Sequence, residues 1–123
     1  MAEPTRRRTA PARSARTRAP RVRLVLSSAP PALAPRLARR LVREGVAACV
    51  SVVPGVRSVY RWKGAVEEAR EALLIIKTTA TALPRCLAAL TATHPYEVPE
   101  GLVLRPTEAL AAYARWLEGS VSS

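Results

Sequence analysis

Two apolar segments separated by a tight turn dominate the chain between Val46 and Thr78. The turn is Lys63-Gly64, and Pro54-Gly55 interrupts the first segment. Proline cannot donate to a strand ladder and glycine permits a bulge, so this interruption indicates either a bulge or two shorter strands. An extended first segment approaches ~50 Å, whereas a folded chain of about 100 residues has a radius of gyration near ~13 Å. The pattern therefore predicts one antiparallel hairpin whose outer part packs against a neighbouring subunit.

The rest of the chain follows the periods of short strands and amphipathic helices. Strands are expected over residues 22–27 and 98–104. Helices are expected where apolar residues recur three and four positions apart, over residues 33–44, 78–93 and 107–118.

This order of elements predicts the fold class. Two βαβ halves that share one antiparallel sheet give an α+β fold, the ferredoxin-like βαββαβ sandwich, here with a long hairpin between its second and third strands and a C-terminal helix. Right-handed crossovers place both main helices on the same face of the sheet. The other face is left bare, which is a second reason to expect self-association.

Charge and composition divide the chain into three parts. Residues 1–20, rich in Arg, Ala, Pro, Ser and Thr, are expected to be a disordered basic tail, residues 21–118 one domain, and residues 119–123 a short disordered tail. The first 23 residues hold eight arginines and one acid (8 − 1 = +7) of the net charge of +11. A nucleic-acid-binding tail, an organelle transit peptide and a solvated extension are the alternatives for the basic segment.

The residue types that are missing exclude several kinds of site. The chain has no Asp, Asn or Gln and one histidine, so an Asp-containing catalytic triad and an EF-hand loop are impossible. Cys49 and Cys86 lie far apart, which favours buried reduced thiols over a disulfide framework. No run approaches the ~20 apolar residues of a membrane span. We expect a cytoplasmic protein with no membrane partner.

Four sequence blocks point to a known family. They are AACV at 47–50, PG-x-x-S-x-Y-x-W-x-G at 54–64, LIIKT at 74–78 and HPYEVPE at 94–100. In this order and spacing, residues 22–118 resemble the CutA family of divalent-cation tolerance proteins. The resemblance implies tight homotrimers of ferredoxin-like subunits, with hairpin arms that reach between them. It also implies a response to copper and other divalent ions, and no enzymatic activity.

Cys49, His94 and Glu97 are the candidate metal ligands, since thiol, imidazole and carboxylate groups bind such ions. Neither Cys49 nor Cys86 has chelating spacing with His94, but His94 and Glu97 are close in sequence and could share an ion with a symmetry mate. Three copies of the chain could bring these ligands together around copper or another divalent cation, which we expect to be bound weakly. The plainer alternatives are a packed thiol at Cys49 and, at His94, a helix-ending residue whose ring bonds a backbone carbonyl. The resemblance implies an intersubunit cleft with Trp62, Lys77 and Tyr96.

Three functions remain open at this point. The first is a homotrimeric divalent-cation tolerance protein with weak binding of copper or other divalent metals. The alternative is a PII-like trimeric sensor that binds a small molecule in intersubunit clefts, disfavoured because no glycine-rich phosphate loop is present. Binding of nucleic acid is expected only through the basic tail, with a steep salt dependence.

Overall fold

The computed structural model describes residues 14–122, and residues 1–13 and 123 lie outside that part. Its elements, in chain order, are β1 (Arg16–Arg18), β2 (Val22–Ala29), α1 (Ala34–Arg43), β3 (Cys49–Trp62), β4 (Ala65–Thr79), α2 (Leu83–Thr93), β5 (Leu102–Leu104), β6 (Glu108–Leu110) and α3 (Ala111–Gly119).

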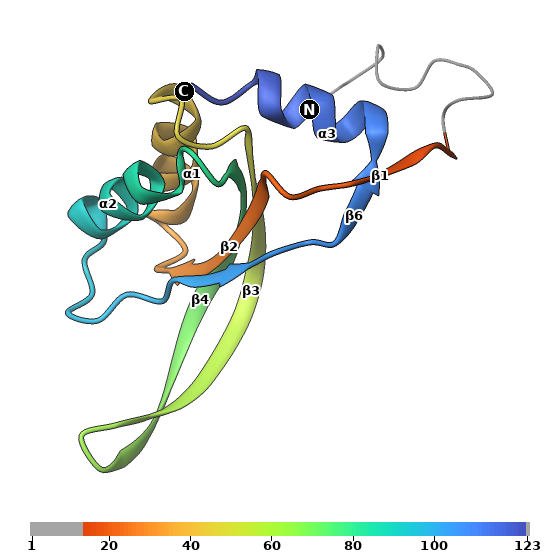
Figure 1. Ribbon diagram of the computed structural model, residues 1–123. Helices are drawn as coiled ribbons and strands as arrows, with labels where there is room; N and C mark the ends of the chain where they lie inside the picture. Colours follow the sequence, from red (N-terminus) through yellow and green to blue (C-terminus); the bar gives the residue numbers. More distant parts are fainter. Residues whose placement is uncertain (1–13, 123) are drawn as a thin grey trace.

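Four strands form the main sheet in the order β3-β4-β2-β5, with every neighbouring pair antiparallel (Figure 1). The segments β2-α1-β3 and β4-α2-β5 are the two halves that share this sheet. This arrangement confirms the predicted ferredoxin-like βαββαβ sandwich, with its long hairpin and its C-terminal helix.

The hairpin of β3 and β4 is one continuous ribbon. Its ladder runs from the pair Cys49 and Lys77 to the pair Trp62 and Ala65, and its register shifts between Val53 and Val56. Pro54-Gly55 is therefore a bulge within one strand and not a break between two strands. Figure 1 shows the outer half of the hairpin extending away from the helices. At its tip, Lys63 and Gly64 have φ of 51° and 84°, as a two-residue hairpin turn requires.

The core lies between the sheet and the helices α1 and α2, which cover one face of it (Figure 1). Leucines and alanines three and four positions apart give α1 a single apolar face toward the sheet. Both α1 and α2 have a proline in the first turn, where its missing amide hydrogen costs no helix hydrogen bond. The buried cluster includes Val25, Ala34, Leu37, Ala38, Leu41, Leu74, Ile76, Cys86 and Leu90.

The opposite face of the sheet has little cover. Side chains alternate across a pleated strand, and residues paired across antiparallel strands share a face. Leu24 and Leu26 therefore lie on the open face with their partners Leu104 and Leu102, because Val25 between them is buried under the helices. Both leucines of β5 are exposed, as are large apolar side chains of the hairpin arm, among them Val59 and Val66.

A second, two-stranded sheet corrects the sequence analysis at both ends of the domain. Arg16–Arg18 pair with Glu108–Leu110, so the expectation of a disordered tail over residues 1–20 is wrong for residues 14–20. Residues 1–13 of that expected tail lie outside the described part. The same pairing delays the last helix from residue 107 to residue 111. Ala19 and Val22 pack on Leu117 of α3, which explains why these flanking segments are ordered.

The remaining boundaries differ for similar reasons. The second main helix begins at residue 83 and not at 78, because Thr78 and Thr79 continue β4 opposite β2. The strand expected over 98–104 is limited to residues 102–104. Most of the short tail expected over 119–123 is held in place: the Ser122 amide donates to the Gly45 carbonyl at 2.8 Å, and Arg85 Nη2 donates to the Ser122 carbonyl at 2.6 Å. Among residues 14–122, no helix reaches the length and apolar character needed to cross a bilayer.

Candidate functional site

A groove of about 730 Å³ lies where the hairpin leaves the core. One wall is formed by β3 and β4, and the other by the segment that follows α2. Aromatic and acidic side chains dominate its lining, which consists of Ser58, Val59, Tyr60, Trp62, Ala69, Glu71, Pro95, Tyr96, Glu97, Val98 and Glu100. A groove with apolar walls and a few polar groups is the usual form of a small-ligand site.

A buried carboxylate, Glu71, organises this groove. It is only 6 % exposed, and Tyr96 Oη donates a hydrogen bond to its Oε2 at 2.6 Å. Burial raises the pKa of Glu71, but hydrogen bonds with Ser58, Tyr96 and Ser28 and the nearby His94 outweigh burial, so that its pKa lies below the usual 4.5. Glu71 is therefore a carboxylate at neutral pH.

Tyr96 is held in its neutral form by the same contact. Burial, and then the hydrogen bond to the Glu71 carboxylate, raises the pKa of Tyr96 above its ordinary value of 10. Proton transfer near neutral pH is most efficient for groups whose pKa lies near 7. Since the two pKa values are driven apart and away from 7, this pair is suited to holding a ligand and not to acid–base catalysis.

His94 ends α2 and locks the following segment onto the sheet. Its Nδ1 accepts a hydrogen bond from the Tyr96 amide at 3.2 Å, so the proton resides on Nε2, which donates to the Ser28 carbonyl at 2.7 Å. The His94 and Tyr96 rings lie 4.6 Å apart, and Ser28 Oγ donates to Glu100 at 3.3 Å. Both ring nitrogens of His94 are thus occupied within one protomer, as in the plainer alternative that the sequence left open.

Cys49 and Lys77 form a second polar position on the open face. They are cross-strand partners, with Lys77 Nζ 3.7 Å from Cys49 Sγ and donating a hydrogen bond to Ser51 Oγ. Cys49 is half-buried, and both cysteines are free thiols. Lys77 lies six residues from Glu71 along β4, which corresponds to about 20 Å. Within one protomer, Lys77 therefore does not line the groove.

The structure thus separates the residues that the sequence singled out. Trp62, Tyr96 and Glu97 line one groove. Cys49, His94 and Glu97 do not converge, and residues 14–122 contain no group of three side chains able to hold a metal ion. However, Cys49, Lys77 and Glu71 all project from the open face, because they occupy alternate positions of one paired ladder. Cys49 and Lys77 therefore lie on the same face as Glu71 but do not meet it within one protomer.

Glu71 is a groove residue that was not among the site residues predicted from the sequence. Its sequence signal is weak: it directly precedes the apolar run 72–76, where the strand enters the core. Its burial and its contact with Tyr96 depend on how the segment after α2 folds over the strand.

Comparison with known proteins agrees with this arrangement. The model of the family described as CutA1 divalent ion tolerance protein matches residues 23–120. The chain belongs to this CutA family. A divalent-cation tolerance protein CutA from Thermus thermophilus is 47 % identical over 81 residues, which are 66 % of this chain and 79 % of that protein. Protein CutA, chloroplastic, from Arabidopsis thaliana is 44 % identical over 85 residues, 69 % of this chain and 47 % of that protein, so this chain spans about half its length.

Solved CutA structures share the whole fold. CutA from Synechococcus elongatus PCC7942 superposes with a TM-score of 0.85 at 38 % identity, covering 90 % of this chain and 99 % of that chain. A protein described as PII-like protein CutA from Nostoc sp. PCC 7120 superposes with a TM-score of 0.77 at 33 % identity, covering 81 % of this chain and 97 % of that one. The CutA family is known by divalent-ion tolerance and not by an enzymatic reaction.

Replacing Tyr96 by Phe tests the role of the buried carboxylate. The Y96F variant loses the hydroxyl that stabilises the Glu71 carboxylate, so the pKa of Glu71 should rise, as measured by carboxyl NMR titration. A hydrogen bond to a charged group contributes about 2 kcal/mol, and the free energy of unfolding should fall by about that amount at neutral pH. The control is Y60F, since Tyr60 lines the same groove but is exposed.

The stability difference between wild type and Y96F should depend on pH in a defined direction. A carboxyl whose pKa is lowered by folding stabilises the protein above the unfolded pKa, here 4.5, and the contribution disappears as pH falls through the lower folded pKa. The stability difference between wild type and Y96F should therefore be complete above pH 4.5 and shrink below it. A difference that persists unchanged at pH 2 would contradict a carboxylate-specific role for Tyr96.

Proposed function

We propose that this CutA-family chain is a homotrimeric divalent-cation tolerance protein that binds copper or other divalent ions weakly at sites completed between subunits. The observation that carries the proposal is that the open face of the sheet and the hairpin arm have little cover. Exposed apolar side chains lie there, together with polar groups that do not meet within one protomer. Within one protomer, the apolar side chains of this face stay uncovered and its polar groups are too far apart to hold a metal ion together.

Assembly is supported first by the exposed apolar surface. Large exposed apolar patches on a folded protein mark interaction sites, because apolar area that remains in water costs free energy. Leu102 and Leu104 on β5 and Val59 and Val66 on the arm provide such area on elements that α1 and α2 do not cover. Three copies arranged around an axis would allow each arm to lie against a neighbour.

The candidate metal ligands support a weak site shared between subunits and not a tight site within one protomer. Cys49 provides a half-buried thiol near the exposed face, whereas both nitrogens of His94 already have partners. The Lys77 ammonium, with Nζ 3.7 Å from Cys49 Sγ, repels a cation and so weakens the site. We therefore place Cys49 first among the candidate ligands and Glu97 second, with His94 as a residue that positions Tyr96.

The second candidate function is a PII-like small-molecule sensor, favoured by the groove itself. A structure of CutA from Synechococcus elongatus PCC7942 is described as complexed with a Bis-Tris molecule, and the Nostoc relative is described as PII-like. In this chain, the Trp62 ring already faces a cation, since Lys63 Nζ lies 5.6 Å from its centroid. An organic cation could bind between this aromatic wall and Glu97.

The oligomeric state tests the assembly. Sedimentation equilibrium should give about three times 13.3 kDa. Leu104 on the open face and Val42 on α1 are exposed to the same degree, 43 % and 42 %. L104E should dissociate the trimer and lower its melting temperature, because a buried unpaired charge is costly and assembly stabilises the fold. V42E should leave mass and melting temperature unchanged, and equal behaviour of the two variants would contradict an interface on the open face.

Copper titration tests the metal. Isothermal calorimetry of wild type should show weak Cu²⁺ binding that C49S weakens by about tenfold or more, because sulfur is the softest donor on the open face. C86S is the matched control, since Cys86 is fully buried and burial raises its pKa to about 11. If C49S and C86S bind copper as wild type does, the assignment of the thiol is wrong.

Bis-Tris titration tests the groove as a small-molecule site. Wild type should give a saturable calorimetric signal that W62A abolishes, because the aromatic wall would be lost. E97Q should weaken binding, whereas E108Q should not, since Glu108 is an exposed glutamate outside the groove. No saturable signal with wild type would remove this second function without affecting the copper result.

A further inference from the structure

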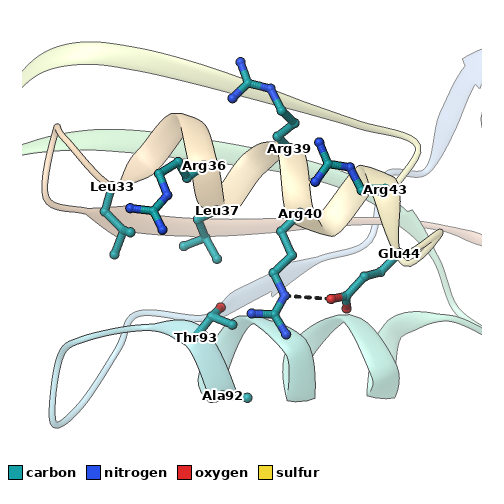
Figure 2. A pocket seen from close by; sticks show the side chains of 9 residues that line it. All are labelled: Leu33, Arg36, Leu37, Arg39, Arg40, Arg43, Glu44, Ala92 and Thr93. Carbon is teal, nitrogen blue, oxygen red and sulfur yellow. Dashed lines mark hydrogen bonds and ion pairs between the residues drawn. The ribbon is translucent and has the colours of Figure 1, made fainter.

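The outer face of α1 carries a stripe of four arginines, Arg36, Arg39, Arg40 and Arg43, here called the arginine stripe. Their spacing of three, one and three residues keeps them on the exposed half of the helix. They line a groove of about 640 Å³ between α1 and the end of α2. In Figure 2, Arg40 extends toward α2 and Arg39 points the opposite way, so the guanidinium groups spread over the whole exposed half.

Most of this charge has no ion-pair partner within the described residues 14–122. Glu44 is the single carboxylate that lines the groove, and it pairs with Arg40, with Nε 2.6 Å from Oε2 (Figure 2). Within residues 14–122, the other three arginines form no ion pair with a carboxylate. The groove therefore carries about three uncompensated positive charges on one helix face.

The structure of the helix does not require this charge. Basic residues in a last turn interact favourably with the helix dipole, which accounts for Arg40 and Arg43. Arg36 lies in the first turn, where the dipole disfavours a cation and where α1 has no acidic residue. The positive charge at Arg36 thus has an electrostatic cost within α1, and a ligand of opposite charge would offset it.

We infer that the arginine stripe binds the phosphodiester backbone of nucleic acid without reading its sequence. Arg36 and Arg43 are separated by about 10 Å along the helix axis. Over this length, each guanidinium group can contact a separate phosphate of a nucleic-acid strand. Guanidinium groups bind phosphate oxygens with two parallel hydrogen bonds, which lysine cannot match.

Among the described residues, this surface lacks the groups that read adenine or stack on bases. The chain contains no Asn or Gln, the side chains that pair with adenine, and no aromatic ring lines the groove for base stacking. Contacts to phosphates alone position a strand without specifying its sequence.

Other polyanion-binding partners fit the surface less well. A membrane-surface helix inserts its apolar face into lipid, but the apolar face of α1 is buried in the core. A protein partner would need apolar or aromatic anchors, and the groove offers one partly exposed leucine, Leu33. The concave, arginine-lined groove matches a narrow charged strand.

The stripe is independent of the proposed cation and ligand sites. It lies on the helix layer, whereas Cys49, Glu71 and the exposed leucines of β5 lie on the opposite face of the sheet. Assembly through the open face would leave the stripes of all copies accessible, and several stripes on one particle would increase avidity.

Charge-matched variants of the full chain test this inference by fluorescence anisotropy with a labelled mixed-sequence DNA strand of about 20 nucleotides. R36Q/R39Q/R43Q should weaken binding by at least about tenfold at 50 mM salt and reduce the slope of log K against log salt by about 2, as expected for three lost phosphate contacts. The control R18Q/R105Q/R115Q removes the same charge from exposed arginines outside the stripe and should change binding less than about threefold.

Equal losses in the two triple variants would overturn the inference, because binding would then follow net charge or the N-terminal arginines. Binding of wild type to phosphatidylserine vesicles but not to DNA would overturn it as well. Phenylglyoxal modification of arginines in the wild type provides a second test, which still applies if the stripe variant does not fold. The DNA strand should protect Arg36, Arg39 and Arg43 more strongly than Arg18, Arg105 and Arg115, and uniform protection would count against the stripe.

Discussion

The hairpin of β3 and β4 extends farther than its own domain can cover, and the rest of the molecule depends on this mismatch. The two strands pair from Cys49 to Trp62, but both main helices lie on one face of the sheet. Apolar side chains on the other face and on the arm remain in water. A ribbon of this length is stable only with further cover. The open face thus combines uncovered apolar side chains with polar groups, and this combination supports the proposed assembly.

Glu71 lies where β4 passes from the covered to the uncovered part of the sheet. A buried carboxylate requires hydrogen-bond donors, and the donors here come from β2, β3 and the segment after α2. The charge thereby ties three elements together and fixes Tyr96, whose amide in turn orients His94. The same contacts drive the pKa values of Glu71 and Tyr96 apart. The groove is rigid and charged, and this supports ligand binding in a family known for ion tolerance.

The two faces of the sheet layer differ in chemistry. The open face combines leucines, a thiol and carboxylates, whereas the helix layer presents guanidinium groups, three of which form no ion pair within residues 14–122. The proposed assembly and cation binding use the first surface, and the proposed binding of phosphates uses the second. The sheet and the buried core separate the two surfaces.

Local patterns in the sequence determined the hairpin, an interruption at Pro54-Gly55, the apolar faces of the two main helices and the family. They did so because turn geometry and side-chain period depend on neighbouring residues. The structure decided that the interruption is a bulge. Trp62 and Tyr96, which the family resemblance assigned with Lys77 to an intersubunit cleft, line one groove within the protomer. Only the tertiary structure decided the pairing of Arg16–Arg18 with Glu108–Leu110, the burial of Glu71 and the separation of Lys77 from the groove. The alternation of a strand shows which side chains share a face, but long-range packing selects the distant segment that covers that face.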